Sequence, residues 1–309
     1  MIAKIGFNKL YLDMRGSVVR IVEGHVYKSG AISINKFGTV LFEGLGFSPP
    51  APDFISNSAG ILNHFLKENG IKTKKAVLCL GRPGIIARAV KVPKMSFVDL
   101  KTHMELEMNE YIPVNSEEYS FDFKIMSVFT EDERDYFNIL AAAVLKRHIE
   151  ECVRIIELAG LKPLAVDIFP NIIWNLLADK YRDVAIIDSG RDGTSLMLCR
   201  GEEIVLYTDI PYRFDNQSDN DFSQLTREIG GYLDFFASRH FGKPVDKIYV
   251  TGELAAHANV PFVLERMFNI PVGPGLKDAA MPEIKGAAAE FGEIASIYAG
   301  NVGLMLREG

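Results

Sequence analysis

Two aspartates in this chain each follow an apolar stretch and precede a turn of small residues. Asp13 follows residues 10–12, and Asp188 follows residues 184–187; the turns after them contain Arg15, Gly16, Ser17, Gly190, Gly193, Thr194 and Ser195. Glycines let backbone N–H groups approach phosphate oxygens, hydroxyl groups donate to those oxygens, and a carboxylate can hold the water shell of a cation. These residue types in this spacing therefore indicate a site for a phosphate and its metal.

A strand is expected on both sides of each turn. Apolar residues at 184–187 and at alternating positions from 196 to 206 predict strand, tight turn and strand. The N-terminal segment repeats the pattern more weakly, because residues 18–22 supply the returning strand. Two such units suggest a duplicated architecture with a ligand between the halves. An ordinary β-hairpin with a polar tip is the alternative interpretation of the segment at 183–206.

Composition and charge narrow the function classes. The chain has 309 residues, enough for about two domains, and its 48% hydrophobic and 24% charged residues are ordinary for a globular protein. A formal net charge of -6 argues against binding to a nucleic-acid backbone, and the small basic cluster at 72–75 is expected to be a solvated strand start. Three cysteines lie within apolar patterns, which favours reduced core residues and a cytoplasmic location. No signal peptide or membrane span is apparent, so any membrane association is expected to be indirect, through a partner.

The element pattern predicts α/β architecture with an insertion. Strands are expected across 9–42, with Gly38 at a bulge or turn, followed by a helix and a buried strand at 76–80. Strand, helix, two strands and helix at 85–161 have the size of a small α+β subdomain. The predicted division is a first domain of 1–84 and 162–182, an inserted subdomain of 85–161, a second domain of 183–295, and a closing helix at 296–309 that packs on the first domain.

Several common site types are missing from the sequence. The six histidines are not at metal-ligand spacing, and CxxC, HExxH, Walker A and GxSxG sequences do not occur. Thr251-Gly252, at the end of a predicted strand, could let a backbone turn pass beside an adenosine, although a Thr-Gly pair alone is weak evidence. No catalytic residue is assigned.

These segments together resemble the actin-like ATPase superfamily, and within it the PilM family of type IV pilus assembly proteins, which is related to FtsA. The specific matches include Glu105-Leu-Glu-Met-Asn-Glu-Tyr-Ile-Pro113 and residues 70–78, 87–93, 160–167, 205–211 and 299–307. The resemblance spans essentially the whole chain. It implies an actin-like fold, two α/β domains around a nucleotide cleft, in which ATP and Mg²⁺ are bound and Asp13 and Asp188 hold the metal through water.

The chain departs from the family pattern around this cleft. Arg15 stands where the first loop usually has glycine, Glu253 follows Gly252 where further glycine is usual, and Gly230-Gly231 replace a common Arg-Ser pair. Arg15 could pair with a phosphate or fill its position, and Glu253 could repel a nucleotide or bind its ribose. The expectation is therefore ATP binding with weak or absent hydrolysis.

The resemblance also implies a partner. It predicts a cytoplasmic, ATP-binding scaffold at the inner membrane that captures the short N-terminal segment of a PilN-like inner-membrane protein, in a groove between the first domain and the insert. Self-association is left open. Two alternatives are a degenerate, nucleotide-independent interaction module of the same fold and, with no base identified for it, a small-molecule kinase.

Overall fold

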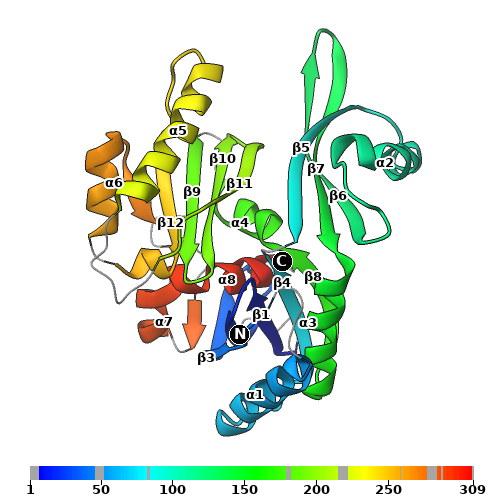
Figure 1. The fold of residues 1–309 in the computed structure, drawn as a ribbon, viewed down its shortest axis with the longest axis vertical. Coiled ribbons are helices and arrows are strands. Elements are labelled where there is room, and N and C mark those ends of the chain that lie inside the picture. The colour runs from blue at the N-terminus through cyan, green and yellow to red at the C-terminus, as the bar shows by residue number, and fades with distance from the viewer. Residues whose placement is uncertain are drawn as a thin grey trace.

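The computed structural model describes residues 7–45, 52–81, 84–178, 182–214, 222–257, 259–276, 284–286 and 288–307. Strands of these residues form three sheets, and Figure 1 shows the second sheet and the insert as two arms above the first sheet. The predicted α/β fold class is confirmed.

The first sheet has the strand order β14-β3-β2-β1-β4-β8. Its strands are β1 (Lys9–Met14), β2 (Val18–Val26), β3 (Ile32–Leu41), β4 (Lys75–Leu80), β8 (Lys162–Ile168) and β14 (Ile284–Gly286). The first three form an antiparallel meander, and β1, β4 and β8 run parallel. The bulge predicted at Gly38 is wrong: Gly38 pairs with Ile21, and the register shifts between Glu23 and Gly24 instead. A Cβ at Gly38 would lie 2.7 Å from the Phe65 ring, so a larger residue there would displace that ring.

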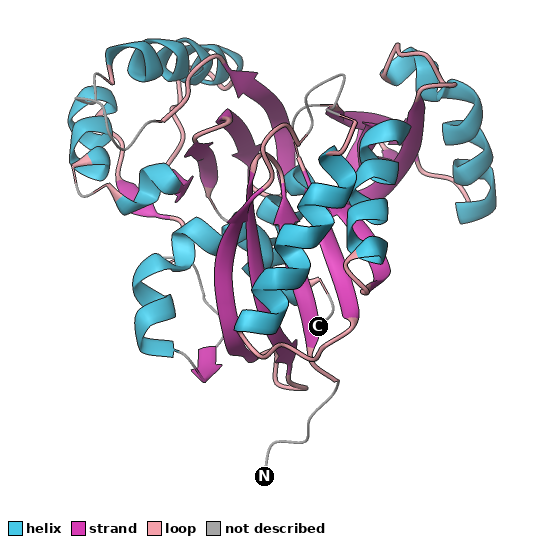
Figure 2. Cartoon of the chain, turned by 60° about the horizontal axis from the view of Figure 1, so that its bottom comes forward, coloured by secondary structure: helices cyan, strands magenta, loops and turns pink. Residues whose placement is uncertain are grey.

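Helices cover both faces of the first sheet. They are α1 (Phe54–Glu68) and α3 (Lys146–Leu158) on one face, and α4 (Phe169–Leu177) and α8 (Ala299–Leu306) on the other. Successive side chains of a strand alternate between faces, so Leu10 and Leu12 pack with α1 and α3 while Tyr11 packs with α4 and α8. Asp13 shares the parity of Tyr11 and thus reaches the α8 side. The turned view in Figure 2 shows helices lying across the sheet and the insert extending to one side.

The insert contains a three-stranded sheet and one helix of its own. The strands are β5 (Ile85–Pro93), β6 (Tyr119–Glu131) and β7 (Arg134–Leu145), in the order β5-β7-β6, and the helix is α2 (Phe97–Tyr111). Ser96 caps α2 by accepting from the Asp99 N–H. The following helix, α3, packs on the first sheet, and β14 also returns to that sheet before residue 295. The domain boundaries taken from the sequence stay a prediction.

The second sheet carries the hairpin expected at 183–206. Its strands are β9 (Asp183–Gly190), β10 (Gly193–Arg200), β11 (Glu203–Ile210), β12 (Lys247–Gly252) and β13 (Val272–Pro274). α5 (Ser223–Arg239), α6 (Val260–Phe268) and the short 3₁₀ helix η1 (Glu253–Ala256) belong to this half. The helix α7 (Ala288–Ile294) and the 3₁₀ helix η2 (Ala295–Tyr298) contact β3 of the first sheet, where Phe291 and Tyr298 pack on Phe37. An apolar core lies between the second sheet and α5 and α6.

The last helix joins the two halves. In α8, Asn301 is fully buried and its amide donates to the backbone oxygens of Tyr11 (2.8 Å) and Arg20 (2.9 Å). Residues of α8 also share a core with β9, β10 and α4. Among the described residues, none of the helices combines the length and apolarity that crossing a bilayer requires.

Candidate functional site: an ion-paired cleft between the two sheets

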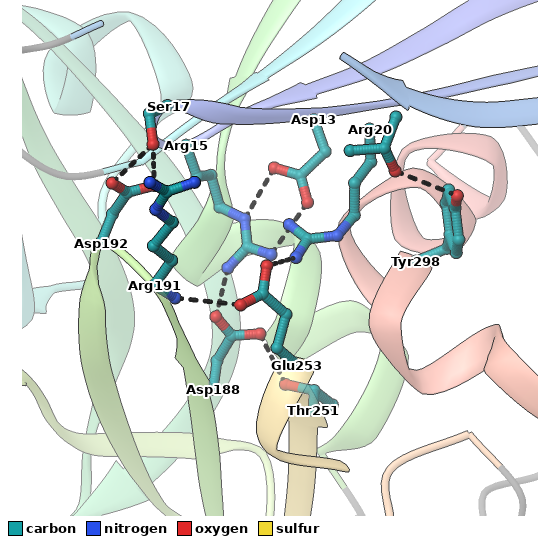
Figure 3. A network of polar contacts seen from close by, with 11 residues as sticks. Asp13, Arg15, Ser17, Arg20, Asp188, Arg191, Asp192, Thr251, Glu253 and Tyr298 are labelled. Carbon is teal, nitrogen blue, oxygen red and sulfur yellow. Dashed lines mark hydrogen bonds and ion pairs between the residues drawn. The ribbon is translucent and has the colours of Figure 1, made fainter. Parts of the chain in front are cut away.

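Asp13 and Asp188 meet in the cleft between the first and second sheets. Asp13 is fully buried near the end of β1, and Asp188 is 6% exposed near the end of β9. The guanidinium of Arg15 lies between them (Figure 3). It donates from Nε and Nη2 to both oxygens of Asp13, at 2.7 and 2.8 Å, and from Nη1 to Asp188 Oδ1 at 2.5 Å.

This arrangement shifts the pKa values of Arg15 and Asp188. Burial alone would lower the pKa of Arg15, but the charges of Asp13 and Asp188 outweigh it and raise that pKa well above its ordinary value. Burial alone would raise the pKa of Asp188, whereas the Arg15 charge and hydrogen bonds from Arg15 and Thr251 lower it below its ordinary value. Arg15 and Asp188 therefore stay charged at neutral pH.

Polar residues beside this triad also form hydrogen bonds, two sets of which cross the cleft. Ser17 Oγ donates to both carboxylate oxygens of Asp192, at 2.8 and 2.9 Å. Arg20 Nη2 lies 2.9 Å from Glu253 Oε1, and Glu253 Oε2 accepts from the Arg191 backbone N–H at 3.1 Å. The first sheet is thus bonded directly to the turns of the second sheet.

The remaining predicted site residues line or support the same place. Gly16, Gly190, Gly193, Gly252 and Glu253 line the cleft beside Arg15 and Asp188. Thr194 and Ser195 are buried in β10, where the Thr194 hydroxyl bonds to Ser189 Oγ at 2.6 Å. Gly252 has a φ of 76°, and a Cβ there would lie 2.5 Å from the Ser189 carbonyl oxygen, so the turn requires glycine.

Sequence reasoning missed four residues of this network: Arg20, Phe169, Asp192 and Thr251. Thr251 was considered only for its turn with Gly252 and not as a hydrogen-bond donor to Asp188. Thr251 Oγ1 donates to Asp188 Oδ2 at 2.8 Å, and Arg15 lies 3.6 Å over the centre of the Phe169 ring. Arg20 did leave a signal, since it is a charged residue inside the apolar strand at 18–22. The Phe169 contact left none, because it joins two positions far apart in the chain.

The residues present do not fit Mg·ATP in this arrangement. Each of the four carboxylate oxygens of Asp13 and Asp188 already accepts a hydrogen bond from Arg15 or Thr251. The cavity beside them has a volume of about 40 Å³, which is space for a few water molecules and not for a triphosphate. Gly16 is also closed in, since a Cβ there would collide with the Asp192 side chain.

Comparison with known proteins identifies the family. A family model described as type IV pilus assembly protein PilM matches residues 12–213, well over half of the chain. The chain belongs to the PilM family. A solved structure titled a PilM-PilN type IV pilus biogenesis complex matches with a TM-score of 0.78 and 18% identity, over 97% of this chain and 98% of that chain.

Two further solved structures are similar to this chain. The ethanolamine utilization protein EutJ from Carboxydothermus hydrogenoformans matches with a TM-score of 0.52 and 12% identity, over 99% of this chain and 92% of that one. A Bacteroides thetaiotaomicron protein with an actin-like ATPase fold matches with a TM-score of 0.48 and 9% identity, over 86% and 90%. The search of curated proteins found no match. The fold is the actin-like ATPase fold, as the sequence predicted.

Proposed function

We propose that this protein is a scaffold of type IV pilus assembly that holds the N-terminal cytoplasmic segment of a PilN-like inner-membrane protein. The proposal places it in the cytoplasm, at the inner membrane through that partner. Its support is the family membership, the likeness to the PilM-PilN complex and, above all, an open groove between the insert and the first sheet.

This insert groove has a volume of about 530 Å³. Its lining residues come from the insert, from β8 and α4, from the first turn of α3 and from the residue after α8. They are Ser120, Phe121, Asp122, Phe123, Lys124, Leu140, Ala142, Val144, Ile149, Val166, Asp167, Ile168, Asn171 and Arg307. On its two sides lie β6 and β8, each the last strand of its sheet. Edge strands present unpaired backbone groups, and an extended peptide can bind by adding to such an edge.

The side chains of the insert groove suit a short, mainly apolar peptide. Leu140, Ala142, Val144 and Val166 offer apolar contact area, while charged groups stand among them. Lys124 Nζ donates to the amide oxygens of Asn171 (2.9 Å) and Asn175 (3.0 Å), and burial lowers its pKa. Arg307 Nε lies 3.0 Å from Asp167 Oδ2. Apolar peptide side chains would thus be buried while these groups orient the peptide backbone.

A titration with the N-terminal peptide of a PilN-like protein tests this site. Ser120 is exposed on β6 and lines the groove, so Ser120→Trp fills it without disturbing a core. We expect Ser120→Trp to weaken binding at least about tenfold, which corresponds to ~1.4 kcal/mol. Val128→Trp is the matched control, since Val128 is 51% exposed on the same strand outside the groove lining. Equal affinities of the two variants would refute the groove as the site.

Two functions considered from the sequence differ in nucleotide use. The filled carboxylate pair favours the nucleotide-independent interaction module over the ATP-binding scaffold, because metal and triphosphate have no room beside Arg15. The ion pairs of Arg15 with Asp13 and Asp188 also argue against a small-molecule kinase, because a kinase needs a bound metal and a free base. Calorimetry with ATP·Mg decides between the two scaffold versions.

A further inference from the structure

In the triad of Asp13, Arg15 and Asp188, the positive charge between the two carboxylates comes from an arginine of the chain itself. Two buried carboxylates this close together need a positive charge between them, because desolvated like charges repel strongly. Arg15 supplies it through three hydrogen bonds of 2.5 to 2.8 Å, two to one sheet and one to the other. A planar guanidinium suits this task because its fixed donors can serve two carboxylates at once.

The Arg15 side chain lies in a fitted slot. Its guanidinium stacks 3.6 Å over the centre of the buried Phe169 ring. A Cβ at Gly81 would lie 2.5 Å from Arg15 Cγ, and a Cβ at Gly300 would collide with the Asp13 carboxylate. Glycine at these two positions therefore leaves the space that the ion pair occupies, and packing holds Arg15 in one orientation.

The charges around the cleft are already compensated within the chain. Arg15, Arg20 and Arg191 stand with Asp13, Asp188, Asp192 and Glu253, which is three positive against four negative charges. Arg20 is paired with Glu253, and Ser17 is bonded to Asp192. Among the described residues around this cleft, no surplus of positive charge remains to attract a triphosphate.

We propose that Arg15 is an internal substitute for the nucleotide-bound metal, so that the chain itself holds the two sheets of the cleft together and needs no nucleotide to do so. Arg15 would then be a permanent clamp. Arg20 with Glu253 and Ser17 with Asp192 are secondary bonds across the same cleft.

The clamp also reaches the insert groove through one helix. Phe169, on which Arg15 stacks, is the first residue of α4. Two residues later, Asn171 binds Lys124 at 2.9 Å and Asp167 at 3.0 Å in the groove lining. The position of Arg15 is thus mechanically linked to the groove, and the clamp keeps the groove preformed.

The main experiment measures thermal unfolding of wild type and Arg15→Gly, each with and without Mg²⁺ and with ATP·Mg. We expect no shift in wild-type Tm with millimolar Mg²⁺ or ATP·Mg. Arg15→Gly leaves two unpaired buried carboxylates, so its Tm should fall by roughly 5 °C or more, and Mg²⁺ should restore part of that loss. Arg200→Gly, at an exposed arginine of the second sheet, controls for loss of one charge.

Several outcomes would overturn the clamp. One such outcome is a higher wild-type Tm with ATP·Mg, and another is calorimetric binding of ATP·Mg to wild type below millimolar concentration. Either would mean that the nucleotide and its metal displace Arg15 from between the two carboxylates. An Arg15→Gly variant as stable as Arg200→Gly would mean that Arg15 clamps nothing. If Arg15→Gly does not fold, the wild-type titrations still decide, and Arg15→Lys should fold with reduced Tm because one ammonium cannot serve both carboxylates.

A second arm measures PilN-type peptide affinity, and it alone rests on the proposed function. We expect wild-type affinity to be the same with and without ATP·Mg, and Arg15→Lys to weaken it several-fold. Failure of the peptide to bind any variant would contradict the proposed function and leave the thermal result valid. Peptide binding that strengthens in wild type with ATP·Mg would overturn the clamp and leave the groove assignment valid.

Discussion

At the scale of single residues, Asp13 and Asp188 show what the sequence can and cannot tell. Their places at strand ends before glycine turns predicted that they would lie near each other, and the structure brings them to one cation. The resemblance implied Mg²⁺, held through water, as that cation, and it left open whether Arg15 binds a phosphate or fills its position. Only the fold decides, because the Arg15–Asp188 contact joins residues 173 positions apart.

His148 provides a residue-scale test that is independent of the cleft. It is 2% exposed on α3, and within the described chain neither ring nitrogen has a hydrogen-bond partner. Burial, with a smaller contribution from Arg147, lowers its pKa from 6.5 to about 4. Between these values the unfolded state binds more protons than the folded state, so stability falls as pH falls through this window.

The predicted measurement is chemical denaturation at pH 7.5 and pH 5. We expect wild type to lose about 2 kcal/mol more than His148→Leu over this interval, because leucine removes the titrating group. His64→Gln, at an exposed histidine, should behave as wild type does. Equal losses in wild type and His148→Leu would show that His148 accepts a proton in the folded state at little cost.

At the scale of elements, the strand-turn-strand units were the most predictable parts. Residues 183–200 form β9 and β10 with a two-residue turn, as their alternating apolar residues indicated. The insert groove could not be predicted from periodicity, because it depends on which strands end their sheets. Hydrophobic spacing finds β6 and β8 but not their place at the edges.

Two helical glycines test whether close packing or helix propensity sets stability in each element. A Cβ at Gly303 in α8 would collide with Cγ2 of Ile172 in α4, whereas a Cβ at Gly231 in α5 would meet no atom within 4 Å. Gly303→Ala should lower the free energy of unfolding by about 1–3 kcal/mol through overpacking.

Gly231→Ala is the matched control and should raise that free energy by about 0.5–1 kcal/mol, because alanine favours the helix. Urea denaturation of both variants measures the two effects. If Gly303→Ala is neutral or stabilising, α4 and α8 can move apart freely, and the close contact between them is not a constraint on the cleft.

At the scale of the whole molecule, the sequence indicated two halves with a ligand between them, and the fold is confirmed as actin-like. What composition and pattern could not indicate is how the halves are joined. The side chains that span the cleft come from segments distant in sequence, such as Ser17 with Asp192 and Arg20 with Glu253. Their pairing depends on the sheet arrangement and not on local propensity.

Solution scattering can measure this joining directly. We expect the radius of gyration of wild type to stay unchanged when ATP·Mg is added, because the closed arrangement is held by side chains. Arg15→Gly should have a larger radius without Mg²⁺, as Asp13 and Asp188 then repel each other across the cleft. A wild-type radius that shrinks with nucleotide would contradict this.

The amide of Asn301 has a consequence for the order in which the molecule assembles. It donates to the backbone oxygens of Tyr11 and Arg20, so the hydrogen bonds of these two buried acceptors depend on a residue 290 and 281 positions further along the chain. Ribosomal synthesis proceeds from the N-terminus, and segments fold as they emerge. β1 and β2 therefore receive these two hydrogen bonds only after Asn301 has been translated.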